Sequence, residues 1–178
     1  MIDPTLEYFG RLLSRLQIEW CVAGAVAANA YRDPRATTDL DLIVNIPAAQ
    51  FPVVRQALER DGWQVARLSP DSAYPDIVRL RHDRFFATDL LLTKIGYQAE
   101  ALRRARSQRP DGPRVLAVED VIIHKLIAHR HRDRADVEEI LKNDPTLDEP
   151  YINLWAAEWG IADRWEEARR ARPVGGHR

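Results

Sequence analysis

The apolar residues of this 178-residue chain change repeatedly between two spacings. Steps of three and four are typical of an amphipathic helix, whereas strict alternation is typical of a strand with one buried face. Helical spacing is found at about 5–16, and strands are indicated at 20–23 and 38–44. Because both periods occur, the chain is expected to form a sheet layered with helices, in the α/β or α+β class.

The same reasoning predicts the remaining elements. A short helix is expected at 26–31, ended by Asp33-Pro34-Arg35. The further expected elements are a helix at 51–61, a strand at 63–68, a loop at 69–76, a hairpin of 77–81 and 84–92 around His82-Asp83, a helix at 97–107, a turn at 110–113, and a short strand at 115–118. Residues 119–142 are expected to form one long helix, or two with a bend near 132–134, and residues 149–170 a final helix.

The length suggests a single globular unit with a short appendage, since domains contain roughly 150 residues. With 46% hydrophobic residues, the chain can bury a substantial core, which argues against disorder as its main state. We expect a core at 1–115 with a mixed sheet flanked by helices, a helical C-terminal region at 116–172 packed on it, and a disordered tail at 173–178.

Charge and cysteine content exclude several classes of protein. The 26 basic and 27 acidic residues give a formal net charge of −1, so a binding site for a polyanion would have to be local. Cys21 is the single cysteine, which excludes an intrachain disulfide framework. No apolar stretch approaches the roughly 20 residues needed to cross a bilayer, and the N-terminus lacks a signal-peptide pattern. We therefore expect a cytoplasmic protein with no membrane partner.

Three carboxylates stand in otherwise apolar strands. Asp39 and Asp41 are two residues apart, so their side chains are expected on one face of a strand, and Asp89 lies in a later strand. Carboxylates held this close require a counter-ion, and oxygen ligands suit Mg²⁺, which leaves positions for water and phosphates. The alternative for a bare Asp-x-Asp is a solvated strand edge.

A glycine turn upstream favours the functional interpretation. Gly24-Ala25 ends a short strand and begins a helix, where exposed backbone N–H groups can bind phosphate oxygens. The alternative for Gly24 is an ordinary tight turn. Thirteen residues separate this turn from Asp39, which leaves room for one helix that returns the chain to an adjacent strand. The phosphate cradle and the carboxylates would then meet at one edge of the sheet.

With these motifs, the sequence resembles the nucleotidyltransferase superfamily, including the minimal nucleotidyltransferases and the AbiEii-type toxins. Two blocks carry the resemblance. The first is Ala23-Gly24-Ala25 followed by Asp39-Leu40-Asp41, with Asp89 as the third carboxylate. The second is His124-Lys125-Leu126-Ile127-Ala128 followed by Arg132-Asp133-Arg134-Ala135-Asp136, which is similar to the Lys-Leu and Arg-Asp-x-x-Asp motifs of AbiEii-like proteins.

The resemblance implies an enzyme that moves a nucleotidyl group from a nucleoside triphosphate to an acceptor hydroxyl. In that interpretation Asp39, Asp41 and Asp89 are the catalytic residues and hold two Mg²⁺ ions. The residues expected to bind the nucleotide are Gly24, Ala25, Lys125 and Asp136. Read from spacing alone, Lys125, His129, Arg132 and Asp136 instead share one solvent-exposed helix face, with Arg132 paired to Asp136.

Several alternatives stay open at this point. The acceptor could be an RNA end, a protein or a small molecule, and the chain could be the toxin of a toxin–antitoxin system with a protein antitoxin as partner. The rival interpretation is a non-catalytic member of the same fold that binds a nucleotide or another protein. Retention of all three carboxylates speaks against this rival, because adjacent like charges are unfavourable without a cation.

Overall fold

The computed structural model describes residues 3–67, 76–143 and 145–171. This part of the chain divides into two compact units. The first unit contains residues 1–26 and 36–116, and the second contains residues 27–35 and 117–178. The chain therefore leaves the first unit between its first two strands, returns to it at residue 36, and leaves it a second time after residue 116.

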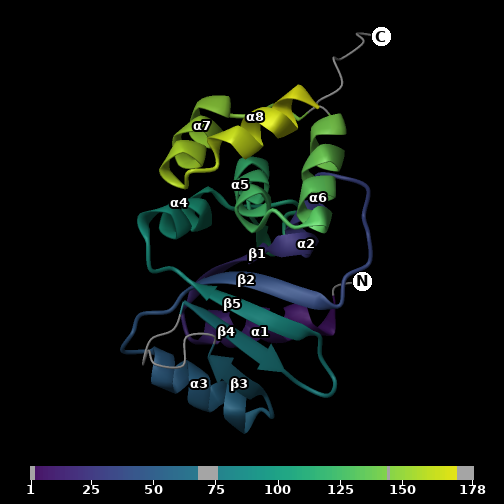
Figure 1. Ribbon diagram of the computed structural model, residues 1–178. Coiled ribbons are helices and arrows are strands. Elements are labelled where there is room, and N and C mark those ends of the chain that lie inside the picture. Colours follow the sequence, from purple (N-terminus) through teal and green to yellow (C-terminus); the bar gives the residue numbers. More distant parts are fainter. Residues whose placement is uncertain (1–2, 68–75, 144, 172–178) are drawn as a thin grey trace. The chain divides into compact units, whose positions relative to one another are not determined.

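The first unit is built on a mixed sheet with the strand order β3-β4-β5-β2-β1-β7-β6, of which Figure 1 labels β1 to β5. The strands are β1 (Glu19–Ala23), β2 (Asp39–Asn45), β3 (Gln64–Arg67), β4 (Ile77–Arg81), β5 (Ala87–Leu92), β6 (Arg106–Ser107) and β7 (Arg114–Val115). Strands β2 and β5 are parallel, as are β1 and β7, and the other neighbouring pairs are antiparallel. The central strand β2 therefore has one antiparallel and one parallel neighbour.

Helices cover both faces of this sheet. They are α1 (Pro4–Arg15), α3 (Phe51–Arg60) and α4 (Gly96–Arg104), and the short α2 (Gly24–Ala28) follows β1 directly. In Figure 1, α1 and α3 lie on one side of the sheet and α4 lies on the other. Helix α1 begins at its N-cap Asp3, which accepts a hydrogen bond from the Thr5 N–H, and it buries Phe9 and Leu13 completely. The apolar spacing of α1 thus turns one face of the helix into the core.

The second unit is helical in its described part. Its helices are α5 (Val118–Ala128), α6 (His131–Lys142), α7 (Glu149–Glu158) and α8 (Ala162–Arg170). Ile122, Ile140 and Ile152 are fully buried among them, and Trp165 is 1% exposed. None of the described helices is both long and apolar enough to cross a bilayer.

Most strands and the helices expected at 5–16 and 51–61 lie close to their predicted positions, but the other four helix predictions need correction. The helix expected at 26–31 ends at Ala28, and the one expected at 97–107 ends at Arg104, because Arg106–Ser107 pairs with β7 as β6. The remaining two predicted helical regions are each divided by a residue with a left-handed backbone, which confirms the two-helix alternative for 119–142. His129 (φ +48°) separates α5 from α6, so the break precedes the bend predicted at 132–134, and Gly160 (φ +63°) separates α7 from α8.

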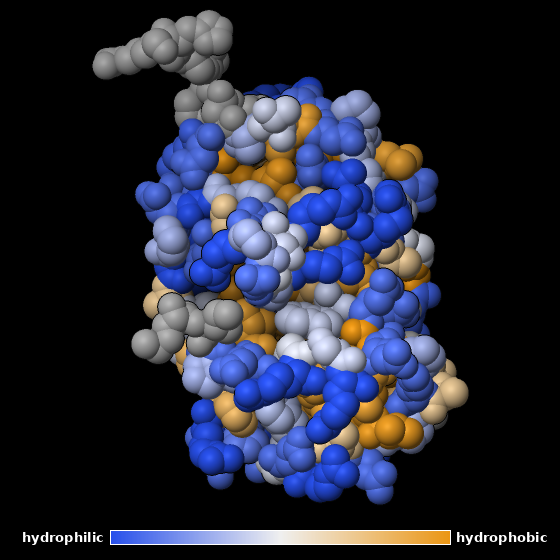
Figure 2. All heavy atoms as spheres, turned by 180° about the vertical axis from the view of Figure 1, so that it is seen from behind, coloured by the Kyte–Doolittle hydropathy of each residue, from blue (hydrophilic) through white to orange (hydrophobic). Residues whose placement is uncertain are grey.

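Two predictions lie wholly or largely outside the described residues: the loop at 69–76, apart from Asp76, and the tail at 173–178. Cys21 is fully buried, as expected for a strand residue in the core. On the face shown in Figure 2, hydrophilic residues dominate and hydrophobic ones form smaller patches among them.

Candidate active site

Three carboxylates lie on one face of the sheet. Asp39 and Asp41 are two residues apart on β2, so their side chains project to the same side. Asp41 and Asp89 are directly opposite each other in the parallel ladder of β2 and β5. We call Asp39, Asp41 and Asp89 the carboxylate row. The structure places the three predicted carboxylates on adjacent positions of one sheet face.

Gly24 lies against the middle of this row. Its φ of +60° is in the left-handed region, which glycine adopts without steric cost. A Cβ atom built on Gly24 would lie 1.8 Å from Oδ2 of Asp41. The turn and the carboxylate meet because Ala23, the last residue of β1, is opposite Asp41 in the antiparallel ladder. The absence of a side chain at Gly24 therefore leaves the space that the Asp41 carboxylate occupies, and Ala25 follows in α2.

Arg79 binds the third carboxylate. It lies on β4 directly opposite Asp89, and its guanidinium donates two hydrogen bonds, from Nε to Oδ1 at 2.9 Å and from Nη2 to Oδ2 at 2.7 Å. Asp89 raises the pKa of Arg79 above its ordinary value, first through this hydrogen bonding and then through its charge, and the charges of Asp39 and Asp41 act in the same direction. A permanent positive charge thus lies within the field of the whole row.

The chemistry of the row suits a hard cation, but its side chains are not gathered into a finished metal site. Carboxylate oxygens are the ligands that Mg²⁺ takes in proteins, commonly one or two per ion. Asp39 and Asp41 supply such oxygens from one strand face. Within the described ranges, however, no three or more His, Cys, Asp or Glu side chains form a group that could hold a metal ion. Both oxygens of Asp89 are engaged by Arg79 instead.

Lys125 and Asp136 belong to the second unit, where they lie in a buried ionic network. The Nζ of Lys125 is 2.7 Å from Oδ2 of Asp136 and 3.0 Å from Oδ1 of Asp133. Asp136 also accepts two hydrogen bonds from the guanidinium of Arg35, both at 3.1 Å, and its Oδ1 lies 3.3 Å from Nε of Arg32. Lys125 is 6% exposed and Asp136 is 3% exposed. We call Arg32, Arg35, Lys125, Asp133 and Asp136 the buried ionic network.

The network sets the ionisation of its two carboxyl groups. Burial by itself would raise the pKa of Asp136, but hydrogen bonds from Arg35 and Lys125 outweigh burial and hold that pKa below its ordinary value. Burial likewise acts to raise the pKa of Asp133, and hydrogen bonds from Arg130 and Lys125 lower it overall. Both carboxylates therefore stay charged in the folded protein at neutral pH.

The alternative interpretation, in which Lys125, His129, Arg132 and Asp136 share one solvent-exposed helix face, is wrong. Helix α5 ends before His129, so the four residues do not belong to one helix. Lys125 and Asp136 are buried, and Asp136 pairs with Lys125, Arg32 and Arg35. The helix spacing was misleading because the left-handed backbone of His129 redirects the chain.

The arginines of both sites are not among the site residues predicted from the sequence. The predicted hairpin of 77–81 and 84–92 could have indicated Arg79, because the register of its two strands decides which residue lies opposite Asp89. The signal for Arg35 was weaker, since 101 residues separate it from Asp136. A contact of that range follows from the fold and not from local spacing.

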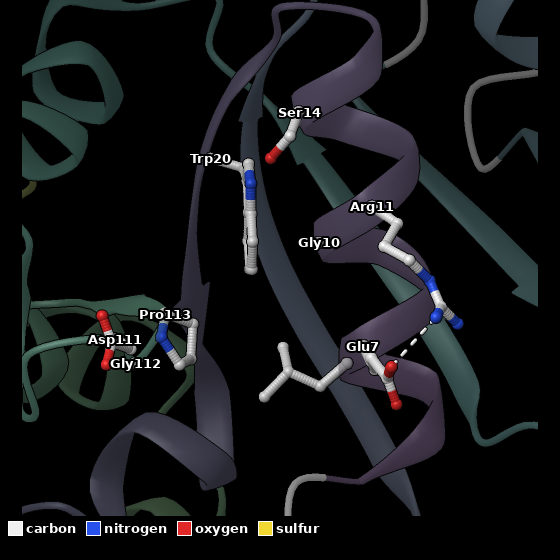
Figure 3. Close-up of a pocket in the computed structure, with 9 residues that line it drawn as sticks. Glu7, Gly10, Arg11, Ser14, Trp20, Asp111, Gly112 and Pro113 are labelled. Atoms are coloured by element: carbon white, nitrogen blue, oxygen red, sulfur yellow. Dashed lines mark hydrogen bonds and ion pairs between the residues drawn. The ribbon is translucent and has the colours of Figure 1, made fainter.

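A groove of about 420 Å³ in the first unit is a separate feature. Figure 3 shows it with α1 on one side and Asp111, Gly112 and Pro113 on the other. Trp20 lines the groove and is opposite Val44 in the β1–β2 ladder. Because Trp20 is three residues from Ala23, which faces Asp41, it projects to the other side of the sheet. The groove therefore lies on the face opposite the carboxylate row.

Comparison with known proteins gives the fold a name. No family model and no curated protein matches the sequence. Among solved structures, the solution structure of the antibiotic-resistance factor ANT(2'')-Ia has a TM-score of 0.61 at 13% identity, covering 93% of this chain and 94% of that one. An antigenic nucleotidyltransferase-like protein from Paracoccidioides brasiliensis has a TM-score of 0.50 at 15% identity, covering 94% and 91%. The chain has the nucleotidyltransferase fold.

A second structure of ANT(2'')-Ia, in complex with adenylyl-2''-tobramycin, is similar over 89% of this chain and 95% of that one, with a TM-score of 0.58 and 13% identity. At these identities the likeness establishes the fold. The nucleotidyltransferase fold agrees with the predicted class, a mixed sheet flanked by helices with a helical C-terminal part.

Proposed function

We propose that this protein is a Mg²⁺-dependent nucleotidyltransferase that moves a nucleotidyl group from a nucleoside triphosphate to an acceptor hydroxyl and releases pyrophosphate. The observation that carries the proposal is the carboxylate row with Gly24 packed against Asp41, on a sheet of the nucleotidyltransferase fold. Like charges on adjacent positions of one face are unfavourable without a nearby cation. Arg79 compensates Asp89, and a divalent cation would add compensation for Asp39 and Asp41.

In this proposal the residues of the first unit orient the reactants. Asp39 and Asp41 would hold two Mg²⁺ ions, with Asp89 as a ligand of one of them. The ions would supply charge neutralisation on the transferring phosphoryl group. The backbone N–H groups at Gly24 and Ala25 would bind triphosphate oxygens, since a turn with no side chain at Gly24 lets phosphate approach the backbone. Asp89, on the neighbouring strand, would accept the proton of the attacking hydroxyl.

The nucleotide-binding role of Lys125 and Asp136 stays a prediction from the resemblance. A direct contact between Lys125 and a phosphate would be costly, because Lys125 would have to leave the two carboxylates that its Nζ contacts at 2.7 and 3.0 Å. We therefore propose that these two residues support nucleotide binding by ordering the second unit.

The experiment that tests the proposed activity offers three classes of acceptor in parallel. Purified protein with Mg²⁺ and each α-³²P nucleoside triphosphate is incubated with total RNA, with cell protein, and with aminoglycosides such as tobramycin. The last arm is included because ANT(2'')-Ia was solved in complex with adenylyl-2''-tobramycin. We expect label in one fraction, and EDTA should abolish its transfer. Nucleotide binding without transfer to any acceptor would favour the non-catalytic alternative.

Matched variants connect the activity to the carboxylate row. Asp39→Asn combined with Asp41→Asn should abolish transfer, while the protein in EDTA unfolds at the same temperature or a higher one, because the two charges no longer repel. Asp83→Asn, in the exposed loop between β4 and β5, removes the same kind of charge outside the row and should leave transfer unchanged. A double variant that unfolds far more easily than the unchanged protein in EDTA would show that the carboxylates are structural.

The toxin role and the antitoxin partner follow only from the resemblance to AbiEii-type proteins, and they are tested separately. Growth of a bacterial host is followed after induction of the unchanged protein or of the Asp39→Asn, Asp41→Asn double variant. Growth arrest that depends on both carboxylates would support a toxin. Equal growth of both cultures would leave a nucleotidyltransferase that acts on a non-essential acceptor.

A further inference from the structure

Arg79 and Asp89 form a cross-strand pair at the end of the carboxylate row. The two residues face each other in the β4–β5 ladder, and each Asp89 oxygen accepts one guanidinium hydrogen bond, at 2.9 and 2.7 Å. This two-bond geometry is the one in which arginine recognises a carboxylate most specifically. The side chains are 44% and 23% exposed, respectively, so the pair is open to exchange with solutes.

The position of Arg79 relative to the row is as important as the pair itself. Asp89 is next to Asp41 across the parallel ladder, and the charges of Asp39 and Asp41 both act on Arg79. The guanidinium therefore stands where a cation shared between Asp89 and the Asp-x-Asp pair would be attracted. Within the described residues the three carboxylates do not form a group that could hold a metal ion, and both oxygens of Asp89 are bound by Arg79.

We propose that Arg79 is the resident counter-ion of Asp89 and competes with a divalent cation for that carboxylate, so that metal ligation by Asp89 requires release of the guanidinium. The inference rests on the proposed function, because it takes the carboxylate row as a metal site. Arg79 is thus a positioning residue that sets how tightly the third carboxylate engages a metal. An exposed pair of this kind is worth up to about 1 kcal/mol, equivalent to about fivefold in affinity.

Metal binding measured directly tests this competition without relying on enzyme activity. Mn²⁺ is titrated into the full-length protein, and free Mn²⁺ is followed by its electron paramagnetic resonance signal. We expect Arg79→Gln to bind Mn²⁺ about fivefold more tightly than the unchanged protein. Arg79→Lys, which keeps the charge but not the planar fork, should show a smaller gain.

Two controls separate competition for Asp89 from a general change in charge. Arg81 is also exposed and lies two residues along β4 on the same face, opposite Gln64, so Arg81→Gln removes the same charge without releasing a carboxylate. It should give a clearly smaller gain than Arg79→Gln. Combining Arg79→Gln with Asp89→Asn should remove the gain, because the released ligand is then missing.

The outcomes distinguish this inference from the proposed function. Mn²⁺ binding that depends on Asp41 but is unaffected by Arg79→Gln and Arg79→Lys would overturn the inference alone. The competition is also refuted if Arg81→Gln gives an equal gain, or if the gain persists in the Asp89→Asn background. Absence of Mn²⁺ binding to every folded variant, checked by circular dichroism, would overturn both proposals. If Arg79→Gln does not fold, the Arg79→Lys comparison decides.

Discussion

Replacement of Lys125 by methionine is the sharpest test of the buried ionic network. Lys125→Met keeps most of the side-chain volume and removes the ammonium that lies between Asp133 and Asp136. Breaking a buried ion pair by removing one partner costs about 3–5 kcal/mol when the remaining charge has no other partner. Here Asp133 keeps Arg130, with Nε at 2.6 Å, and Asp136 keeps Arg35. We therefore expect a cost below that range, about 2–3 kcal/mol.

Thermal unfolding followed by far-ultraviolet circular dichroism measures this cost. For a chain of this size, 1 kcal/mol shifts the midpoint by about 2–4 °C, so Lys125→Met should lower it by about 4–12 °C. Lys142→Met is the matched control, because Lys142 pairs with Glu139 on the exposed side of α6 and carries the same charge. Its midpoint should stay close to that of the unchanged protein.

The result that refutes the reasoning is equally specific. If Lys125→Met and Lys142→Met unfold at the same temperature, the ammonium of Lys125 does not stabilise the second unit. Weaker nucleotide binding by a fully stable Lys125→Met protein would then restore a direct phosphate contact. A large loss of stability together with weaker nucleotide binding would support the ordering role of Lys125.

Further predictions concern Gly24 and the loss of folding stability at low pH. Gly24→Ala should displace the Asp41 carboxylate, because Oδ2 of Asp41 lies 1.8 Å from the position of the new Cβ, and should reduce nucleotidyl transfer by about a hundredfold. The control is Gly160→Ala, since Gly160 also has a left-handed φ but nothing within 4 Å of the new Cβ. This control should affect stability only. Equal transfer by both variants would contradict the proposed phosphate-binding turn at Gly24 and Ala25. Because Asp133 and Asp136 have lowered pKa values when folded, their stabilisation is present above the ordinary pKa of 3.8 and is lost as pH falls through the lower folded values. Urea unfolding from pH 7 to pH 2.5 should show this loss, and an unchanged loss of folding stability at low pH in Asp136→Asn would contradict it.

The sequence predicts best those elements whose apolar spacing reflects one continuous buried face. Helix α1 and strand β2 have a continuous apolar face, so spacing alone locates them within a residue or two. The helical region after residue 118 was harder, because the backbone reversals at His129 and Gly160 occupy one residue each. A histidine in the left-handed conformation carries no turn signal in its residue type.

The candidate site shows the same division. Asp39 and Asp41 could be placed on one face from the two-residue period of a strand, and Gly24 from its turn. The in-register pairing of Asp41 with Asp89 was not available from local pattern, because a parallel ladder joins segments that are far apart in the chain. Residue type suggested that Lys125 is solvated, and its burial depends on compensation by two carboxylates from another helix.

The excursion of residues 27–35 into the second unit has a consequence for synthesis on the ribosome. Arg35 is made 101 residues before its partner Asp136. At about 5–20 residues per second, about 5–20 s pass between the synthesis of Arg35 and the synthesis of Asp136. A gene fragment that begins at residue 117 would lack Arg32 and Arg35, leaving Asp136 with fewer cations. The helical half is therefore not an independent module that recombination could move as one continuous piece.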